Sequence, residues 1–203
     1  MRFNNYDPGF WLLDDDPDKS AQMLTNEYLE KSLKACMQCM LSAYLYRCGC
    51  RSSRAHAWLF SKERKKASMD EHFPGWPYRG VPGMTRYTSR QAKWTRKSAA
   101  HFFLVRNYLD ALVREYEFRF GKPARESSFL EWSDANCSSL KLPPLRRGLI
   151  ALEYKCLPPK YRLVNVLEGI RRYYVNRIGD PLTAYSGSKR PVPDFVMTGI
   201  GVA

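Results

Sequence analysis

Two long stretches of this chain repeat apolar residues every three or four positions, which is the spacing of one face of an α-helix. Between Asp18 and Tyr46 the repeat consists of Leu24, Tyr28, Leu33, Met37, Met40 and Tyr44. Between Ser89 and Phe120 it consists of Thr95, Ala99, Phe102, Phe103, Leu109, Leu112, Val113, Tyr116 and Phe120. We therefore predict two long helices, of which the second would be ~48 Å long at ~1.5 Å per residue and would form the spine of the fold.

Residues that start and stop helices frame both stretches. Asp16 and Pro17 suit an N-cap and a first-turn proline, and Gly49 is the expected end of the first helix. Gly121 is expected to end the second helix, because Pro123 prevents its continuation.

The remaining segments complete an all-α prediction of about five helices. Further helices are expected at 54–66, capped by Ser53, at 143–154, and at 159–177, where Gly179 closes the helix. Prolines and glycines predict an irregular but packed loop at 72–84. The sequence thus predicts one helical domain, residues 1–179, followed by an extended C-terminal arm, residues 180–203.

The charge of the chain is strongly positive and concentrated in its middle. The 33 Lys and Arg outnumber the 20 Asp and Glu, for a formal net charge of +13. Between Arg47 and Arg125 there are 18 basic and 6 acidic residues, a net of +12. Such a segment favours phosphate-rich partners, and we expect DNA, most readily duplex DNA, to be the partner.

The expected nucleic-acid contacts are basic and aromatic side chains of this middle segment. On the predicted second helix, positions 90, 93, 94 and 97 share one face by helical spacing. Arg171, Arg172 and Arg177 extend the basic surface more weakly. The residues predicted to bind nucleic acid are Arg90, Lys93, Trp94, Arg96, Lys97, Lys62, Arg64, Lys65, Lys66 and Trp76.

Several other classes of protein find no support in the sequence. No secretory signal and no apolar run of the roughly 18 residues that a membrane span needs are visible. We therefore expect a cytoplasmic protein without a membrane partner. The phosphate-binding, dinucleotide-binding and serine-hydrolase motifs are missing as well, and no cofactor is expected.

Four cysteines, Cys36, Cys39, Cys48 and Cys50, lie close together in the spacing C-x2-C-x8-C-x-C, with His56 nearby. This pattern suits a structural zinc site. Cys36 and Cys39, however, fall inside a predicted helix, where small buried cysteines are ordinary core residues. We favour the core interpretation, expect no metal, and keep zinc as the alternative.

Three polar residues could carry chemistry by residue type. His101 follows Lys97 by about one helical turn and could act as a general acid or base. Glu30 and Lys31 are adjacent on the first helix, and a desolvated lysine can be a nucleophile. The plainer interpretations are that His101 forms only local hydrogen bonds and that Glu30 and Lys31 are surface charges.

Three stretches of the chain, Asp18–Leu41, Trp94–Lys122 and Pro158–Arg177, resemble a family of small helical proteins from bacteriophages and their hosts. That family is associated with pyrimidine-dimer DNA glycosylases and with phage enzymes that act on modified thymine. The resemblance spans most of the chain in the family's order. The matched polar and aromatic positions are Lys31, Gln38, Trp94, Arg96, Ser98, Glu115, Tyr116, Arg119, Gly121, Lys122, Tyr161, Arg172, Tyr173 and Tyr174.

The chain also departs from this family at positions that matter for chemistry. Tyr28 and Ala35 stand where the family has a histidine and a glutamate, and that glutamate corresponds to the catalytic residue of the glycosylases. Ser89 and Gln91 stand where the family has histidines and a cysteine. The resemblance therefore implies a divergent member whose chemistry is changed or absent.

The leading hypothesis is a phage-type DNA-binding protein that acts on a base, by glycosylase-like or base-modification chemistry. Such enzymes extract the base into a pocket, here rimmed by the loop around Trp76 and the helix that carries Trp94. The predicted catalytic residues are Lys31, Glu30, Gln38, His101 and Glu115. The alternatives are a non-enzymatic DNA-binding or phage accessory protein and, with less support, an RNA-binding protein, and the oligomeric state stays open.

Overall fold

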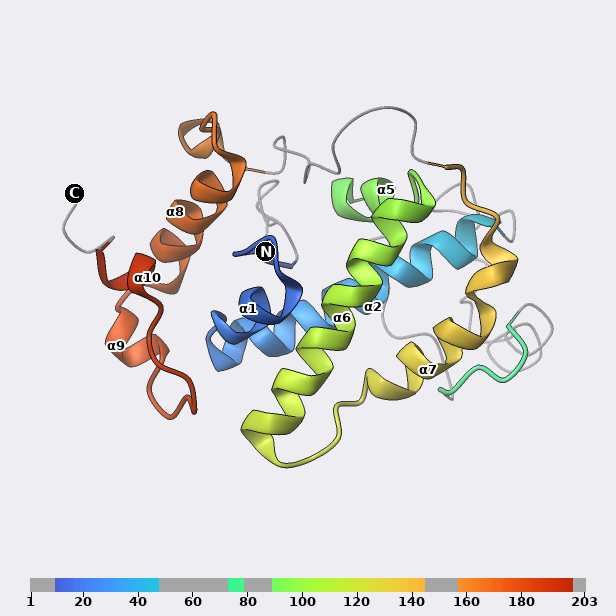
Figure 1. Cartoon of the computed structure of the whole chain (residues 1–203), viewed down its shortest axis with the longest axis horizontal. Coiled ribbons are helices and arrows are strands. Elements are labelled where there is room, and N and C mark those ends of the chain that lie inside the picture. The colour runs from blue at the N-terminus through green and yellow to red at the C-terminus, as the bar shows by residue number, and fades with distance from the viewer. Residues whose placement is uncertain (1–9, 48–72, 79–88, 145–156, 199–203) are drawn as a thin grey trace, which may run out of the picture.

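The computed structural model describes residues 10–47, 73–78, 89–144 and 157–198, and all regular structure within these ranges is helical (Figure 1). This confirms the predicted all-α single domain. The helices are α1 (Pro17–Gln22), α2 (Asn26–Arg47), α5 (Arg90–Thr95), α6 (Ala99–Phe120), α7 (Ser127–Asn136), η1 (Cys137–Leu140), η3 (Pro159–Tyr161), α8 (Val166–Ile178), α9 (Pro181–Ala184) and α10 (Asp194–Thr198).

The two long helices, α2 and α6, cross near the centre of the molecule, and the shorter elements pack around them (Figure 1). All six apolar residues predicted for the first helix face are buried. The second face is buried or half-buried except at Phe103, which is 45% exposed, so its prediction as a core residue is wrong. Helical periodicity thus identified the two faces that build the core.

The first long helix is broken, although the sequence predicts a continuous one from Asp18. Residues 23–25 separate α1 from α2. The backbone N–H of Thr25 donates to Tyr174 Oη at 2.8 Å, and Tyr185 Oη donates to the carbonyl of Met23. Side chains from distant parts of the chain therefore satisfy the backbone groups that the break exposes, which is why local periodicity could not reveal it.

The second long helix is also broken, at Arg96–Ser98 between α5 and α6. Ser98 has an extended backbone and caps α6 by accepting from the N–H of His101. The N–H of Ala99 donates to the carbonyl of Pro143 at 3.0 Å. The predicted single helix of residues 89–120 is therefore wrong, because a serine cap and a distant carbonyl serve the first turn of α6.

The predicted helix ends at Asp16, Pro17 and Gly121 are confirmed, whereas the helix predicted from residue 159 begins only at Val166, after the short η3. Asp16 caps α1 through its carboxylate, and Pro17 opens that helix. Gly121 ends α6 with φ +65°, a conformation that glycine adopts without steric cost. No helix is predicted for α7 and η1, and the predicted helices at 54–66 and 143–154 and the stop at Gly49 lie largely or wholly outside the described residues.

The C-terminal segment is helical in two places, which corrects the predicted extended arm. Residues 181–184 form α9 and residues 194–198 form α10. Tyr185 and Val196 are buried, at 5% and 0% exposure. The segment therefore packs against the helical body, and Figure 1 shows it beside α8.

A buried charge cluster joins this segment to the α1–α2 junction. Arg119 and Glu115 lie one turn apart on α6, with side chains only 1% and 4% exposed, and their Nε–Oε1 distance is 2.7 Å. The guanidinium of Arg119 also donates to the carbonyls of Gln22 and Leu24 at 2.9 and 2.7 Å. Arg190 donates two hydrogen bonds to the carboxylate of Glu115, at 3.0 and 2.8 Å.

This cluster gives Glu115 a low pKa despite its burial. Desolvation raises the pKa of the carboxyl group, but the hydrogen bonds and charges of Arg190 and Arg119 outweigh it, and the net shift is downward. The carboxylate is therefore ionised and bonded by two arginines.

None of the described helices combines the length and apolar character that crossing a membrane requires.

We expect Arg119→Met to lower the free energy of unfolding by about 3 to 5 kcal/mol, because it removes one of the two guanidinium partners of a buried carboxylate and leaves two helix-end carbonyls without that donor. Arg172→Met is the matched control. Arg172 forms the same i, i+4 pair with Glu168, but the two side chains are 60% and 47% exposed, so about 0.5 kcal/mol or less is expected. Urea denaturation of both variants measures the difference, and equal losses would contradict the structural role of Arg119.

We also expect the stabilisation by Glu115 to disappear at low pH. Because its pKa is lower in the folded than in the unfolded chain, its contribution is complete above the usual value of 4.5 and is lost as the pH falls through the lower folded pKa. Urea denaturation of wild type and Glu115→Gln from about pH 6 to about pH 3 should show a shrinking difference in stability. A constant difference over that range would count against an ionised Glu115.

Candidate functional site

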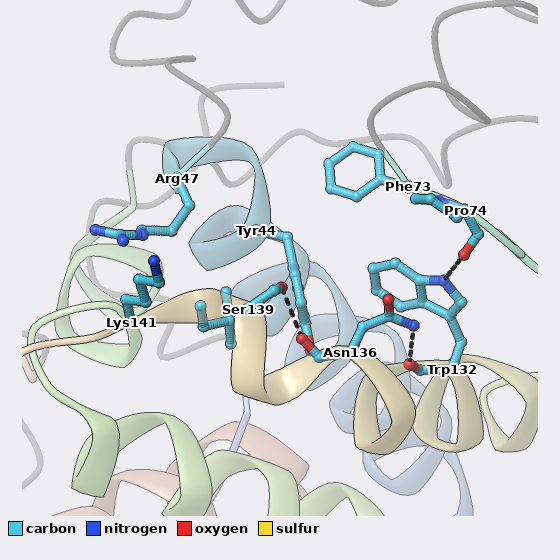
Figure 2. Close-up of a pocket in the computed structure, with 9 residues that line it drawn as sticks. Tyr44, Arg47, Phe73, Pro74, Trp132, Asn136, Ser139 and Lys141 are labelled. Carbon is cyan, nitrogen blue, oxygen red and sulfur yellow. Dashed lines mark hydrogen bonds between the residues drawn. The ribbon is translucent and has the colours of Figure 1, made fainter.

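A cavity of about 470 Å³ opens where the last turn of α2, the loop at 73–78, the end of α7 and η1 meet (Figure 2). We call it the α2–α7 cavity. Its volume lies within the roughly 300–1,000 Å³ of typical small-molecule sites. It is lined by Tyr44, Arg47, Phe73, Pro74, Trp132, Asn136, Ser139, Leu140 and Lys141.

One side of the α2–α7 cavity is a wall of three aromatic rings, Tyr44, Phe73 and Trp132. The ring of Trp132 lies 4.8 Å from Tyr44 and 5.8 Å from Phe73 between centroids. Tyr44 Oη donates to the carbonyl of Ser133 at 2.9 Å, and burial raises the pKa of Tyr44 far above its usual value. The wall is therefore uncharged and held in place by hydrogen bonds at its edges.

The loop at 73–78 reaches the cavity through a tight turn. The N–H of Trp76 donates to the carbonyl of Phe73 at 3.1 Å, and Gly75 has φ +71°. Proline followed by a glycine with positive φ is the pattern of a type II turn. The carbonyl of Pro74 then accepts from Trp132 Nε1 at 2.9 Å, so the turn is fixed to α7.

Trp76 itself supports the aromatic wall from behind. It is 8% exposed, and its ring lies 5.0 Å from that of Trp132 and 6.0 Å from that of Phe129. The predicted packed loop is confirmed over the described residues 73–78. Trp76, predicted to contact nucleic acid, is nevertheless a core residue. Phe73 and Pro74 line the cavity, and Phe73 is only 4% exposed.

The opposite side of the α2–α7 cavity carries two cations, Arg47 and Lys141. Figure 2 shows their charged ends close together, on the side away from Phe73 and Trp132. Both residues are exposed. Among the described residues neither has an acidic partner. Two neighbouring cations without a counter-charge attract an anion.

The backbone of Lys141 adopts the left-handed conformation, with φ +43° and ψ +44°. Among the described non-glycine residues it alone has positive φ. This conformation costs a residue with a Cβ roughly 1–2 kcal/mol. A lysine therefore occupies, at the rim of the cavity, a position that glycine would fill with less strain.

Two polar side chains complete the lining between the rings and the cations. Asn136 Nδ2 donates to the carbonyl of Trp132 at 2.8 Å, and Ser139 Oγ donates to the carbonyl of Asn136 at 2.7 Å. Because a carbonyl can only accept, the amide nitrogen of Asn136 must face Trp132, and its Oδ1 faces away. Figure 2 shows this oxygen directed between Tyr44 and Trp132, into the cavity.

The four positions predicted to share one helix face do not all lie on one helix. The helix α5 ends at Thr95, before Lys97, and Trp94 is 2% exposed. Trp94 packs edge-on against His101 at 4.6 Å between centroids. Arg90, Lys93 and Lys97 are exposed, and we call these three residues the α5 cationic surface.

Arg96 packs the end of α5 against the last turn of α2. The guanidinium of Arg96 lies 5.1 Å from the ring centroid of Tyr46. Tyr46 precedes Arg47, which lines the cavity. The end of α5 and the turn that carries Arg47 are therefore in contact.

The predicted catalytic residues lie in separate places. Glu30 and Lys31 are exposed on α2, and Lys31 forms an ion pair with Glu27. Gln38 is buried seven residues further along α2, about 10 Å away at ~1.5 Å per residue. None of these three residues lines the α2–α7 cavity.

His101 and Glu115 are likewise separated, by fourteen residues of α6 or about 21 Å. His101 is 3% exposed, and its Nδ1 lies 2.6 Å from Ser98 Oγ. Glu115 is held by Arg119 and Arg190. The structure thus separates Glu30 and Lys31 from Gln38 along α2, and His101 from Glu115 along α6.

The positions matched by the family resemblance are mostly structural in this fold. Tyr174 bonds the backbone of Thr25, Arg119 bonds the α1–α2 junction, and Gly121 ends α6. Arg172 pairs with Glu168 on the surface, and Tyr161 packs on Tyr173 at 5.0 Å between centroids.

Part of the predicted surface and of the cysteine pattern lies outside the described residues. These residues are Lys62, Arg64, Lys65, Lys66, Cys48, Cys50 and His56. Cys36 and Cys39 are buried in α2. Within the described ranges no three His, Cys, Asp or Glu side chains are arranged to hold a metal ion, and the zinc alternative stays a prediction.

Comparison of the chain with protein-family models, with curated proteins and with solved structures finds no match. The resemblance to the bacteriophage family therefore rests on the three sequence stretches alone. The candidate site is defined by its geometry.

Most of the cavity lining was missed by the sequence analysis. Tyr44 was predicted only as a core residue, and α7 with Trp132 and Asn136 was not predicted at all. One signal was present, since the aromatic Pro/Gly loop was expected to form a pocket rim. The partners of that loop come from α2, α7 and η1, which only tertiary packing brings together.

We expect Lys141→Gly to be more stable than Lys141→Ala by roughly 1 kcal/mol, because both remove the charge but only glycine removes the cost of positive φ. Thermal unfolding of the two variants and the wild type measures the effect. Equal stability of the glycine and alanine variants would show that residue 141 is not held in the left-handed conformation.

Proposed function

We propose that this protein is a nucleic-acid-binding protein that holds the sugar-phosphate backbone on the α5 cationic surface and on Arg47 and Lys141. The proposal is carried by one observation: exposed cations gather on α5 and at the last turn of α2, and the contact of Arg96 with the ring of Tyr46 places the end of α5 against that turn, which carries Arg47. Phosphate contacts of this kind supply most of the affinity of sequence-independent binding.

Two lysines of this region are available for phosphate groups. Lys93 and Lys97 are exposed, and no acidic partner for either is found among the described residues. Several acidic residues of the described chain pair elsewhere, as in Asp134 with Arg106, Asp14 with Arg171 and Glu115 with Arg119. Lys93 and Lys97 are therefore not neutralised from within the described part of the fold.

Binding without catalysis accounts for the site better than action on a base. The described lining of the cavity offers aromatic rings, cations and an amide, which are groups that hold a nucleotide. The residues predicted for catalysis lie at four other locations. A base-acting enzyme stays the second candidate, because the volume of the cavity suits a ligand the size of a single base. Mass spectrometry of DNA incubated with the protein tests this candidate. Release or change of a nucleoside would favour it.

We expect binding to a short duplex, or to one of its strands, to weaken steeply between about 50 and 200 mM salt. The double variant Lys93→Gln, Lys97→Gln should weaken binding and reduce the slope of log affinity against log salt by about 1 to 2, because up to two phosphate contacts are lost. Fluorescence anisotropy with DNA and RNA versions of the same sequence measures affinity and backbone preference.

The matched control is Lys19→Gln, Lys160→Gln, which removes the same charge from exposed positions on α1 and η3. Its salt slope should equal that of the wild type. Equal slopes for both double variants would remove the α5 cationic surface from the proposal, and salt-independent or undetectable binding would refute the proposed function.

A further inference from the structure

We propose that Tyr46, on the last turn of α2, stacks on an unpaired base of a bound nucleic-acid strand, while the exposed cations beside it contact the phosphates of that strand. This inference rests on the proposed function and names the class of nucleic acid that the surface selects. A strand whose base faces are uncovered should therefore bind more tightly than a strand of the same charge that has no bases.

Tyr46 differs from the two other aromatic residues of α2. It is 40% exposed, whereas Tyr28 and Tyr44 are 8% and 3% exposed. The hydroxyl groups of Tyr28 and Tyr44 donate to the carbonyls of Arg177 and Ser133, but the hydroxyl of Tyr46 forms no hydrogen bond within the described part of the chain. Tyr46 is therefore an aromatic residue that the core neither buries nor bonds.

Arg96 supports one face of the Tyr46 ring. Its Cζ lies over the ring at 5.1 Å from the centroid, and Arg96 is itself half-buried at the end of α5. This contact restricts the orientation of the ring, so that less side-chain freedom is lost when a ligand binds. Because Arg96 covers one face, the exposed surface of the ring lies on its edge and on the opposite face, where a planar base can stack.

Three further cations lie beside this aromatic–cation pair. Arg47 follows Tyr46 along the chain, and Lys97 follows Arg96. Lys93 lies on the last turn of α5, which Arg96 ends. Arg47, Lys93 and Lys97 are exposed, and no acidic residue of the described ranges pairs with them. A base on Tyr46 would therefore place its phosphates within reach of basic side chains, which is the combination that single-strand binding uses.

The last turn of α6 carries a similar pair in a different environment. Phe118 is 49% exposed, and Arg190 Cζ lies 4.3 Å from the centroid of its ring. There, however, Arg190 donates two hydrogen bonds to Glu115, and Lys189 donates to the carbonyl of Phe118 at 2.8 Å. The cations beside Phe118 therefore hold the C-terminal segment in place, which makes Phe118 a matched control for Tyr46.

A ring next to cations favours a nucleic-acid strand over an acidic peptide. The carboxylates of a peptide would engage the cations but would leave the ring of Tyr46 without a planar partner. A base that is joined to phosphates engages both. Inside a perfect duplex both faces of a base are covered by its neighbours in the stack, so Tyr46 favours a base that is unpaired and unstacked.

The first experiment compares two single strands of equal length and charge by fluorescence anisotropy at fixed salt. One is an oligothymidine strand of about ten nucleotides, and the other has an abasic sugar at every position. We expect the strand with bases to bind roughly tenfold more tightly, which is the size of one stacking contact. Equal affinity of the two strands would overturn the inference. Tighter binding of a polyglutamate peptide of the same charge would indicate an acidic protein as the partner and would also overturn it.

The second experiment assigns this preference to Tyr46. Tyr46→Leu removes the ring and should lower the preference for the strand with bases from roughly tenfold to about twofold or less. Tyr46→Phe keeps the ring and should retain the preference. Phe118→Leu removes a ring of similar exposure and should leave the preference unchanged. A full preference in Tyr46→Leu, or a lost preference in Tyr46→Phe, would overturn the inference.

A gain of affinity provides a test that does not depend on the folding of the leucine variant. Tyr46→Trp enlarges the ring at an exposed position and should increase the preference for the strand with bases, because a larger ring covers more of the base. Far-UV circular dichroism checks that each variant is folded. A folded Tyr46→Trp variant without any preference for the strand with bases would place the base elsewhere.

The two proposals fail in different ways. Salt-dependent binding with equal affinity for the two strands removes only Tyr46 as the base contact. Loss of all salt-dependent binding to DNA and RNA refutes the proposed function, and the inference on Tyr46 fails with it.

Discussion

The buried pair of Glu115 and Arg119 is the interaction on which the arrangement of this fold depends. A charged pair with side chains 1% and 4% exposed is tolerable only when every polar atom finds a partner. Arg119 meets this condition by bonding the carbonyls at the α1–α2 junction, and Glu115 meets it by accepting from Arg190 as well. One cluster therefore fixes the break before α2, the position of α6 and the return of the C-terminal segment. The same saturation of its oxygens explains why Glu115 is suited to holding the fold rather than to proton transfer.

The other end of α2 serves a different purpose. There Tyr44, Phe73 and Trp132 pack against one another and against neighbouring rings, and they line the α2–α7 cavity with only 3%, 4% and 7% of their surface exposed. Lys141 keeps a strained backbone at this rim, and Arg47 stands beside it without an acidic partner in the described chain. Strained backbones and charges without a partner in the fold are common at binding sites. The charges of Glu115 and Arg119, near the start of α2, thus stabilise the fold. The charges of Arg47 and Lys141, near its end, remain accessible to a ligand.

The parts of the fold that were predictable depend on short-range patterns. Both buried faces, the Asp16 cap and the ends at Gly121 and Gly179 follow from residues close together in sequence. The two helix breaks were not predictable, because Tyr174, Arg119 and Pro143 supply the compensating hydrogen bonds from far along the chain. Trp76 and Trp94 were expected to contact nucleic acid but are buried, since large aromatic residues suit a core as well as a stacking surface.

The sequence by itself determined a helical chain with two amphipathic segments, a basic middle and an aromatic Pro/Gly loop. These properties are set by composition and by residues a few positions apart. Only the tertiary structure decided which charges stay exposed and which aromatic rings line a cavity. The physical reason is that burial and pairing are properties of neighbours in space: α2, the loop at 73–78, α7 and η1 are distant in sequence, and the α2–α7 cavity exists only where they meet.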